Sequence, residues 1–187
     1  MKKILIILMF LTPVFCSAQE YSEVVQIPGK TADQLYTSSR EWFALFFKSA
    51  DDVLQMDDPI AQKLIGKGNL YIKGSSLVNW YVNLTINITC RDGRFKCDLS
   101  GITVSREING KLLDGDEDFK IYQNKKEYFK NASDPEWIKK NIKKHGMIKA
   151  IAAINGAYYN LIVDTEKALA GIPTSLKKHA SKVDADW

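Results

Sequence analysis

Histidines and cysteines are the residues through which this sequence of 187 residues could perform catalysis. His145 lies in a lysine-rich stretch and His179 near the C-terminus, and neither has an evident serine, cysteine or carboxylate partner of the kind found in a catalytic triad. Cys90 and Cys97 lie in a segment of alternating hydrophobicity rather than at a helix N-terminus, where a thiolate is activated. The sequence therefore predicts no catalytic residue.

Two glycines beside a lysine, in the stretch LIGKGNLYI at 64–72, raise the question of a phosphate-binding loop. A dinucleotide fingerprint needs a third glycine where Tyr71 stands, followed by a helix rather than by more strand. A Walker-type loop needs four residues between its glycines, and then Gly-Lys-Ser/Thr at a helix N-terminus. Neither pattern is present, so no cofactor site is predicted.

The same stretch has the pattern of a strand. With a period of two, one face carries Leu64, Gly66, Gly68, Leu70 and Ile72. Glycines on a buried face leave a trough in which a bulky neighbour can approach the backbone closely. The aromatic residues of the preceding helix are the expected neighbours, with Trp42 or Phe46 as the predicted fillers.

Acidic residues within 107–133 raise the question of a calcium site. An EF-hand loop that begins at Asp114 would need glycine at its sixth position and glutamate at its twelfth, but Phe119 and Lys125 stand there. We therefore predict no metal site. The segment is expected to be mainly a solvated loop, in which the residues DFKIY could add a short edge strand.

The two cysteines of the predicted hairpin leave two alternatives open. Asp92 and Gly93 form a favoured two-residue turn, which sets Cys90 opposite Phe95 and Cys97 opposite Ile88. The cysteines are then diagonal, and a disulfide, which needs a Cβ separation of roughly 3.5–4.5 Å, would be strained. A longer turn would bring them into register. Cys90 and Cys97 are therefore either a disulfide of an exported protein or two buried thiols.

The first eighteen residues have the features of a secretory signal peptide. A lysine pair precedes an apolar run at 4–11, and small residues precede a cleavage point after Ala18. The run is too short to cross a bilayer, which takes about 20 residues. Phe15, where a lipoprotein signal has a small residue, argues against acylation of Cys16. We therefore expect an exported protein, periplasmic or extracellular, with no transmembrane segment after cleavage.

Composition sets limits on the partners. The whole chain has 26 basic and 22 acidic residues, and removal of the signal peptide takes away two lysines and leaves a net charge of about +2. A nearly neutral domain without a basic stripe is not typical of a nucleic-acid-binding protein. The remaining residues suit one domain with one core, expected at 19–173.

The hydrophobic pattern predicts strands at 23–27, 53–56 and 63–73, a hairpin over 77–106 and a helix that begins at Thr31. It also predicts one long helix, or two, at 134–171. In the first helix, Thr31 and Gln34 have the spacing of a capping box. Its apolar stripe is Leu35, Trp42, Phe43, Phe46 and Phe47.

The C-terminal helix has clear start and stop signals. Pro135 stands in its first turn, and Gly171 and Pro173 predict its end. Its expected buried stripe is Ile138, Ile142, Ile151, Tyr158, Leu161, Ile162 and Leu169. The tail at 174–187 is expected to be weakly structured.

These elements predict the α+β class, with one antiparallel sheet of about five strands and two helices on one face, in the order β-α-β-β-β-β-α. The passages IPGKTADQLYTSSREWF and VLQMDDPIAQKLIGKGN, the signal peptide and the hairpin resemble an exported Bacteroidetes family, domain of unknown function 4468. The resemblance covers 21–106 and implies a TBP-like fold. It implies no catalytic residues, and a fold alone does not imply DNA binding. The alternative fold is a helix-grip sheet around a ligand cavity.

The absence of a reactive constellation favours a non-enzymatic binding or interaction module of the cell envelope, whose partner is an envelope protein or a small ligand. One alternative is a carrier of hydrophobic ligands, with a cavity between the sheet and the C-terminal helix. Another is an envelope hydrolase. No nucleic-acid partner is expected.

Overall fold

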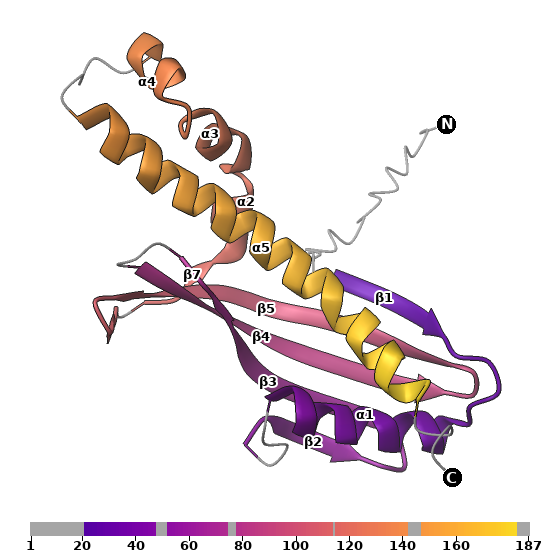
Figure 1. The fold of residues 1–187 in the computed structure, drawn as a ribbon. Helices are drawn as coiled ribbons and strands as arrows, with labels where there is room; N and C mark the ends of the chain where they lie inside the picture. The colour runs from indigo at the N-terminus through magenta and orange to yellow at the C-terminus, as the bar shows by residue number, and fades with distance from the viewer. Residues whose placement is uncertain (1–20, 48–51, 75–77, 114, 142–146, 183–187) are drawn as a thin grey trace, which may run out of the picture.

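An antiparallel sheet forms the centre of the fold (Figure 1). The computed structural model describes residues 21–47, 52–74, 78–113, 115–141 and 147–182. Five strands follow in the order β1-β5-β4-β3-β2, and two short strands, β6 and β7, pair with β5. The strands are β1 (Tyr21–Gln26), β2 (Leu54–Asp58), β3 (Lys63–Ile72), β4 (Val78–Arg91), β5 (Arg94–Ile108), β6 (Lys111–Leu112) and β7 (Glu117–Asp118).

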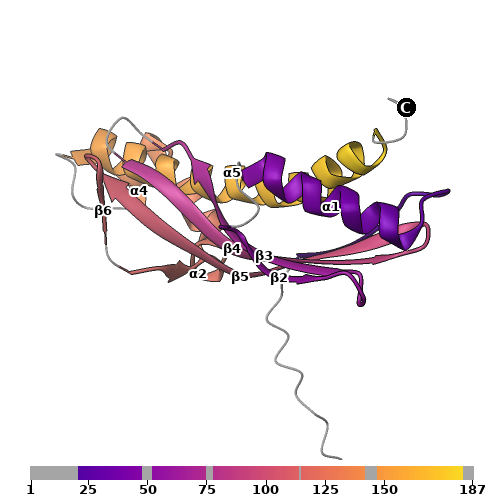
Figure 2. The ribbon, with the colours of Figure 1, turned by 90° about the horizontal axis from the view of Figure 1, so that it is seen from below.

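Two long helices, α1 (Ala32–Phe47) and α5 (Ile148–Ala180), lie on the same side of the sheet (Figure 2). Between β7 and α5 the chain forms three short helices, α2 (Phe119–Gln123), α3 (Lys126–Asn131) and α4 (Pro135–Asn141). The predicted α+β class, with two helices on one face of an antiparallel sheet, is confirmed. The predicted signal peptide at 1–18 lies outside the described residues, as do Asp114, Ile142 and His145.

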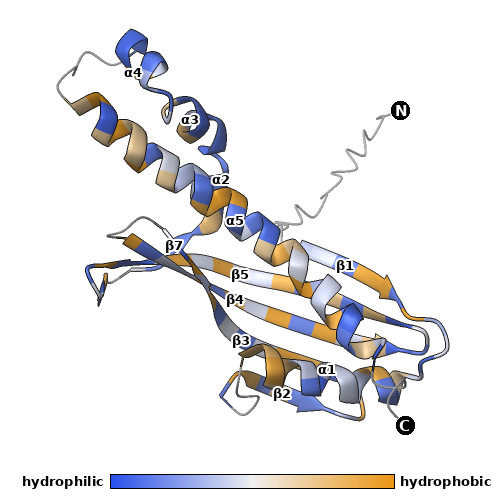
Figure 3. Ribbon diagram, in the orientation of Figure 1, coloured by the Kyte–Doolittle hydropathy of each residue, from blue (hydrophilic) through white to orange (hydrophobic). Residues whose placement is uncertain are grey.

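Side chains in β4 and β5 alternate between the two faces of the sheet. The buried face is called the dry face, and the face open to solvent is called the wet face. In β4 the even-numbered residues from Trp80 to Cys90 are buried, whereas the odd-numbered residues between them remain partly exposed. The turn at Asp92 and Gly93 sets Cys90 opposite Phe95 and Ile88 opposite Cys97, as predicted. Hydropathy follows the same alternation along these strands (Figure 3).

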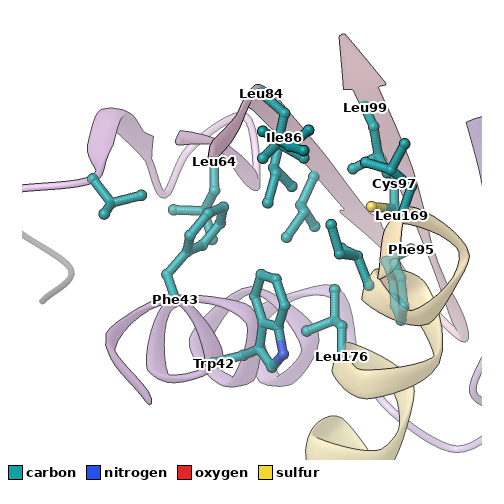
Figure 4. Close-up of a cluster of buried hydrophobic side chains, with 14 of the residues drawn as sticks. Trp42, Phe43, Leu64, Leu84, Ile86, Phe95, Cys97, Leu99, Leu169 and Leu176 are labelled. Carbon is teal, nitrogen blue, oxygen red and sulfur yellow. The ribbon is translucent and has the colours of Figure 1, made fainter. Parts of the chain in front are cut away.

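The core fills the space between the dry face of the sheet and the two long helices. Side chains from three strands and both helices point toward one another there (Figure 4). The largest fully buried members of the core include Phe43, Phe95, Leu64, Ile86, Leu99, Leu161 and Leu169. At the start of α1, the Thr31 N–H donates to Gln34 Oε1 at 2.9 Å and the Gln34 N–H donates to Thr31 Oγ1 at 3.2 Å, which confirms the capping box.

The glycines of β3 do form a trough, but different rings fill it. A Cβ added to Gly66 would lie 2.5 Å from Phe43 Cε1, and a Cβ added to Gly68 would clash with the ring of Phe47. The predicted fillers, Trp42 and Phe46, are therefore wrong. Trp42 instead faces α5, because its indole N–H donates to Ser175 Oγ at 3.1 Å.

The predicted end of the C-terminal helix is also wrong, since α5 continues through Gly171 and Pro173 to Ala180. A proline inside a helix costs roughly 3 kcal/mol, because a backbone hydrogen bond is lost and the ring clashes with the preceding turn. The extra turns bury Ile172 and Leu176, at 1% and 0% exposure. Full burial of each such side chain contributes about 1.5–3 kcal/mol, which offsets the cost of the proline. Residues 174–180 are thus helical rather than a weakly structured tail.

The segment expected to be a solvated loop contains structure as well. The edge strand expected at DFKIY is wrong, because Phe119–Gln123 form α2; only Asp118 of that stretch, together with Glu117, pairs with β5. The chain turns into a helix at Phe119, where Asp118 Oδ1 accepts from the Lys120 N–H at 2.8 Å. Phe119 and Tyr122 are 2% and 4% exposed, so this helix contributes two aromatic rings to the core.

The trough gives a direct test of the contact between α1 and β3. We expect Gly66→Ala to lower the free energy of unfolding by about 1–3 kcal/mol, because Phe43 is fully buried and has no room to retreat. Urea denaturation followed by circular dichroism measures this change.

The matched control is Gly171→Ala in α5, where an added Cβ meets nothing within 4 Å. It should stabilise the protein by up to about 1 kcal/mol, since alanine favours a helix over glycine. Equal effects of the two substitutions would contradict the trough.

Candidate functional site

A polar hollow lies on the face of the sheet opposite α1 and α5. Its volume is about 700 Å³, and we call it the outer-face hollow; it is lined by Asn69, Tyr81, Asn83, Ser105, Glu107, Gly110, Leu112 and Asp116. Its strand residues are brought together by register, because Tyr81 pairs with Ser105 and Asn83 with both Asn69 and Thr103. The turn after β5 and the residues before β7 form its rim.

Hydrogen bonds hold the polar side chains of the hollow in place. Ser105 Oγ donates to Asp116 Oδ1 at 2.5 Å, and Asn83 Nδ2 donates to Asp116 Oδ2 at 3.2 Å. Asn83 Nδ2 also lies 3.0 Å from Ser105 Oγ, and Thr103 Oγ1 lies 3.3 Å from Asp116 Oδ2. The carboxylate of Asp116 therefore accepts hydrogen bonds from three neutral side chains.

A second contact fixes the other carboxylate. Tyr81 Oη donates to Glu107 Oε2 at 2.7 Å, and this hydrogen bond raises the pKa of Tyr81, so the phenol keeps its proton. The ring of Tyr81 also meets that of Tyr71, with centroids 5.7 Å apart. Within the described ranges, neither Glu107 nor Asp116 forms a salt bridge with a basic side chain. The hollow is hydrogen-bonded, rich in acceptors and negatively charged.

The arrangement can bind but lacks the parts of a catalytic relay. Ser105 has a carboxylate partner, yet the described histidine, His179, lies in α5 with its Nε2 3.5 Å from Glu41 Oε2, away from the lining of the hollow. Asp57 and Asp58, at the other end of the sheet, bind Arg40 and backbone N–H groups respectively. The described residues contain no group of three histidine, cysteine or acidic side chains that could hold a metal ion.

The sequence did not predict this site. Asn83 lies on the polar side of the alternating hairpin, but no local pattern marks Ser105, Glu107 or Asp116 as site residues. Asp116 precedes the short strand β7, inside the segment expected to be a solvated loop. Its role depends on a contact across the sheet that no local pattern encodes.

Comparison with known proteins finds one family model that matches part of the chain. The sequence profile described as "Domain of unknown function (DUF4468) with TBP-like fold" matches residues 21–105. This stretch is a DUF4468 match. The resemblance and the TBP-like fold expected from the sequence are confirmed.

Two solved structures are similar in fold. One is a TBP-like protein from Parabacteroides distasonis, with 12% identity and a TM-score of 0.49, covering 84% of this chain and 92% of that chain. The other is a DUF4468 family protein from Bacteroides ovatus, with 17% identity and a TM-score of 0.49, covering 84% of this chain and 85% of that one. No curated protein matches the sequence.

The DUF4468 match divides the outer-face hollow. Asn69, Tyr81, Asn83 and Ser105 lie inside the matched range, whereas Glu107 and Asp116 follow it. The acidic rim therefore comes from a part of the chain that the family profile does not cover. None of the helices in the described part of the chain is both long and apolar enough to span a membrane.

The two cysteines of the DUF4468 stretch are free thiols in the core. Cys97 is 1% exposed, and burial raises its pKa to about 12. Burial likewise raises the pKa of Cys90 to about 11. The contact between Cys90 Sγ and Ser39 Oγ, at 3.7 Å, lowers this pKa by less than burial raises it. Their diagonal register is the one in which a disulfide would be strained.

Thiol chemistry tests this arrangement. At mildly alkaline pH we expect iodoacetamide to spare both cysteines in the folded protein, because a raised pKa leaves little thiolate and burial excludes the reagent. For the protein without the predicted signal peptide, which contains Cys16, intact-mass spectrometry should show two adducts after unfolding in guanidinium chloride without any reductant. Unfolded protein that accepts adducts only after reduction would instead establish the disulfide.

Proposed function

We propose that this chain is an exported, non-enzymatic binding module of the cell envelope that holds a polar ligand in the outer-face hollow. The single observation that carries the proposal is the preformed network of Tyr81, Asn83, Ser105, Glu107 and Asp116 around about 700 Å³ of open volume. The signal-peptide features of the first eighteen residues support export.

A preformed network favours binding for an energetic reason. Association costs free energy when side chains must be ordered on binding, at about 0.5–1.5 kcal/mol for each flexible side chain. In the hollow this ordering is already present, since Ser105 is 5% exposed and is bonded to Asp116 at 2.5 Å. An incoming ligand therefore meets fixed acceptors rather than mobile ones.

The chemistry of the hollow sets the ligand class. Two carboxylates without basic partners and two side-chain amides offer more acceptors than donors. The complementary ligand is rich in hydrogen-bond donors, such as a polyhydroxylated or amine-bearing compound. Anionic ligands would meet the negative charge of Glu107 and Asp116 and are disfavoured.

An internal carrier of hydrophobic ligands has less support. Between the sheet and residues 161–176 of α5, the side chains of Leu161, Ile162, Leu169 and Leu176 are 0–1% exposed and fill the interior. An apolar ligand would have to displace this packed core.

A ligand panel tests the proposal. Neutral sugars, amino sugars, polyamines and uronic acids are titrated calorimetrically against the exported form of the protein. We expect binding by sugars or amines and little by uronic acids. Asp116→Asn should weaken the binding at least about 10-fold, because a hydrogen bond to a charged group contributes roughly 1.5–3 kcal/mol.

The matched control is Asp134→Asn, at the start of α4 and remote from the hollow. Asp134 Oδ1 accepts from the Glu136 N–H at 2.9 Å, and asparagine caps a helix about as well as aspartate. The Asp134→Asn variant should bind each ligand of the panel with the affinity of the wild type. Equal affinity of the Asp116→Asn variant for every binder in the panel would refute the assignment of the hollow.

A further inference from the structure

A small apolar groove lies where α5 leaves the sheet, on the dry face and therefore on the opposite side from the outer-face hollow. We call it the end groove; its volume is about 170 Å³, and it is lined by Val78, Trp80, Arg106, Ile108, Ala153, Ile154, Ala157 and Tyr158. This volume equals about six water molecules at roughly 30 Å³ each. It is room for a short hydrocarbon chain, not for a large lipid.

The groove is open because of the residues that α5 presents there. Positions 153, 157 and 161 follow at intervals of four and share one face of the helix. Leu161 is 1% exposed and reaches the core, but Ala153 and Ala157 have only one side-chain carbon each. In Figure 1, the C-terminal half of α5 lies over the strands, whereas its N-terminal half runs beside α3 and α4. The gap therefore forms where small side chains coincide with the departure of the helix.

One wall of the groove is fixed by stacked aromatic rings. The ring centroid of Tyr158 lies 5.3 Å from that of Trp80, 5.9 Å from Tyr122 and 5.0 Å from Phe129. Ile154, one helical turn before Tyr158 in α5, is 58% exposed. The end groove thus combines a rigid apolar wall with an apolar side chain that water contacts, which favours an apolar occupant.

Arg106 alone is charged among the described residues that line the groove. Its Nη1 donates to Tyr158 Oη at 3.2 Å, and its Nη2 forms a salt bridge with Glu117 Oε1 at 3.8 Å, a distance too long for a hydrogen bond. A guanidinium has five N–H donors in a planar fork that fits a carboxylate. Because its side chain is 36% exposed, Arg106 has donors that an incoming anion can reach.

We propose that the end groove binds a short apolar carboxylic acid in its ionised form. The hydrocarbon chain lies against Trp80, Ile108 and Ala157, and the carboxylate accepts hydrogen bonds from Arg106. This site is separate from the outer-face hollow, and its assignment does not depend on the function proposed above.

Calorimetric titration with sodium octanoate tests the proposal, with octanol and octylamine as probes of the same chain length. We expect octanoate to bind at least 10-fold more tightly than either. Arg106→Gln should remove this preference for the acid, and Arg106→Lys should restore part of it. A preference for octanol or octylamine, or equal affinity for all three, overturns the proposal.

A second pair of variants tests the location without touching the charge. Ala157→Leu fills the groove and should weaken octanoate binding at least 10-fold. Ala170→Leu places the same side chain on an exposed part of α5 and should leave it unchanged. Thermal melting confirms that each variant is folded. Octanoate binding that Ala157→Leu does not weaken, or that is undetectable in the wild type, overturns the proposal.

Discussion

The fold depends on the close approach of α1 to the dry face of β3. Phe43 and Phe47 occupy the positions where side chains of Gly66 and Gly68 would stand, so the helix lies nearer to the sheet than any other residue type there would allow. Trp42, one position earlier on the same helix, is thereby directed toward α5 and bonds to Ser175. One contact between a helix and a strand thus sets the place of the second helix.

The same constraint decides which face of the sheet is available to ligands. Because both long helices cover one face, the odd-numbered residues of β4 remain on the other, where Tyr81 and Asn83 meet Ser105 of β5. A sheet with one wet face can carry a continuous polar network without loss of core packing. The outer-face hollow is a consequence of this separation. Its carboxylates come from Glu107 in β5 and from Asp116, which follows β5.

Sequence patterns predicted most of this arrangement, and the failures have physical causes. The hairpin register followed from Asp92 and Gly93, because a two-residue turn leaves no freedom in pairing. The prediction of which aromatic rings lie above the glycines was wrong. An apolar stripe wide enough to include both Trp42 and Phe43 does not specify how the helix is rotated about its axis. The predicted end of α5 was wrong because local stop signals in the sequence do not reveal that Leu176 is buried in the core. Tertiary packing overrode propensity in both places.

The candidate site was harder to predict than the fold, because its parts come from distant segments. Asp116 reaches Asn83 across 33 residues of sequence, and neither residue has a local pattern that points to the other. Composition does identify the wet face of the hairpin, since Asn83, Thr85, Asn87 and Thr89 alternate with apolar residues. A hollow on that face needs a rim, and the rim appears only when the chain after β5 folds back along it.

The two candidate binding sites share the same pair of strands. Successive residues of a strand point to opposite faces, so Ser105 and Glu107 line the outer-face hollow while Arg106 lines the end groove. Tyr81 and Trp80 of β4 divide in the same way, and Trp80 pairs directly with Arg106. A single two-strand segment therefore presents the carboxylate of Glu107 to one side and the guanidinium of Arg106 to the other. The ligands best matched to the two sites therefore differ in chemistry. The hollow suits a ligand rich in hydrogen-bond donors, and the groove suits a carboxylate. The thickness of one sheet separates them.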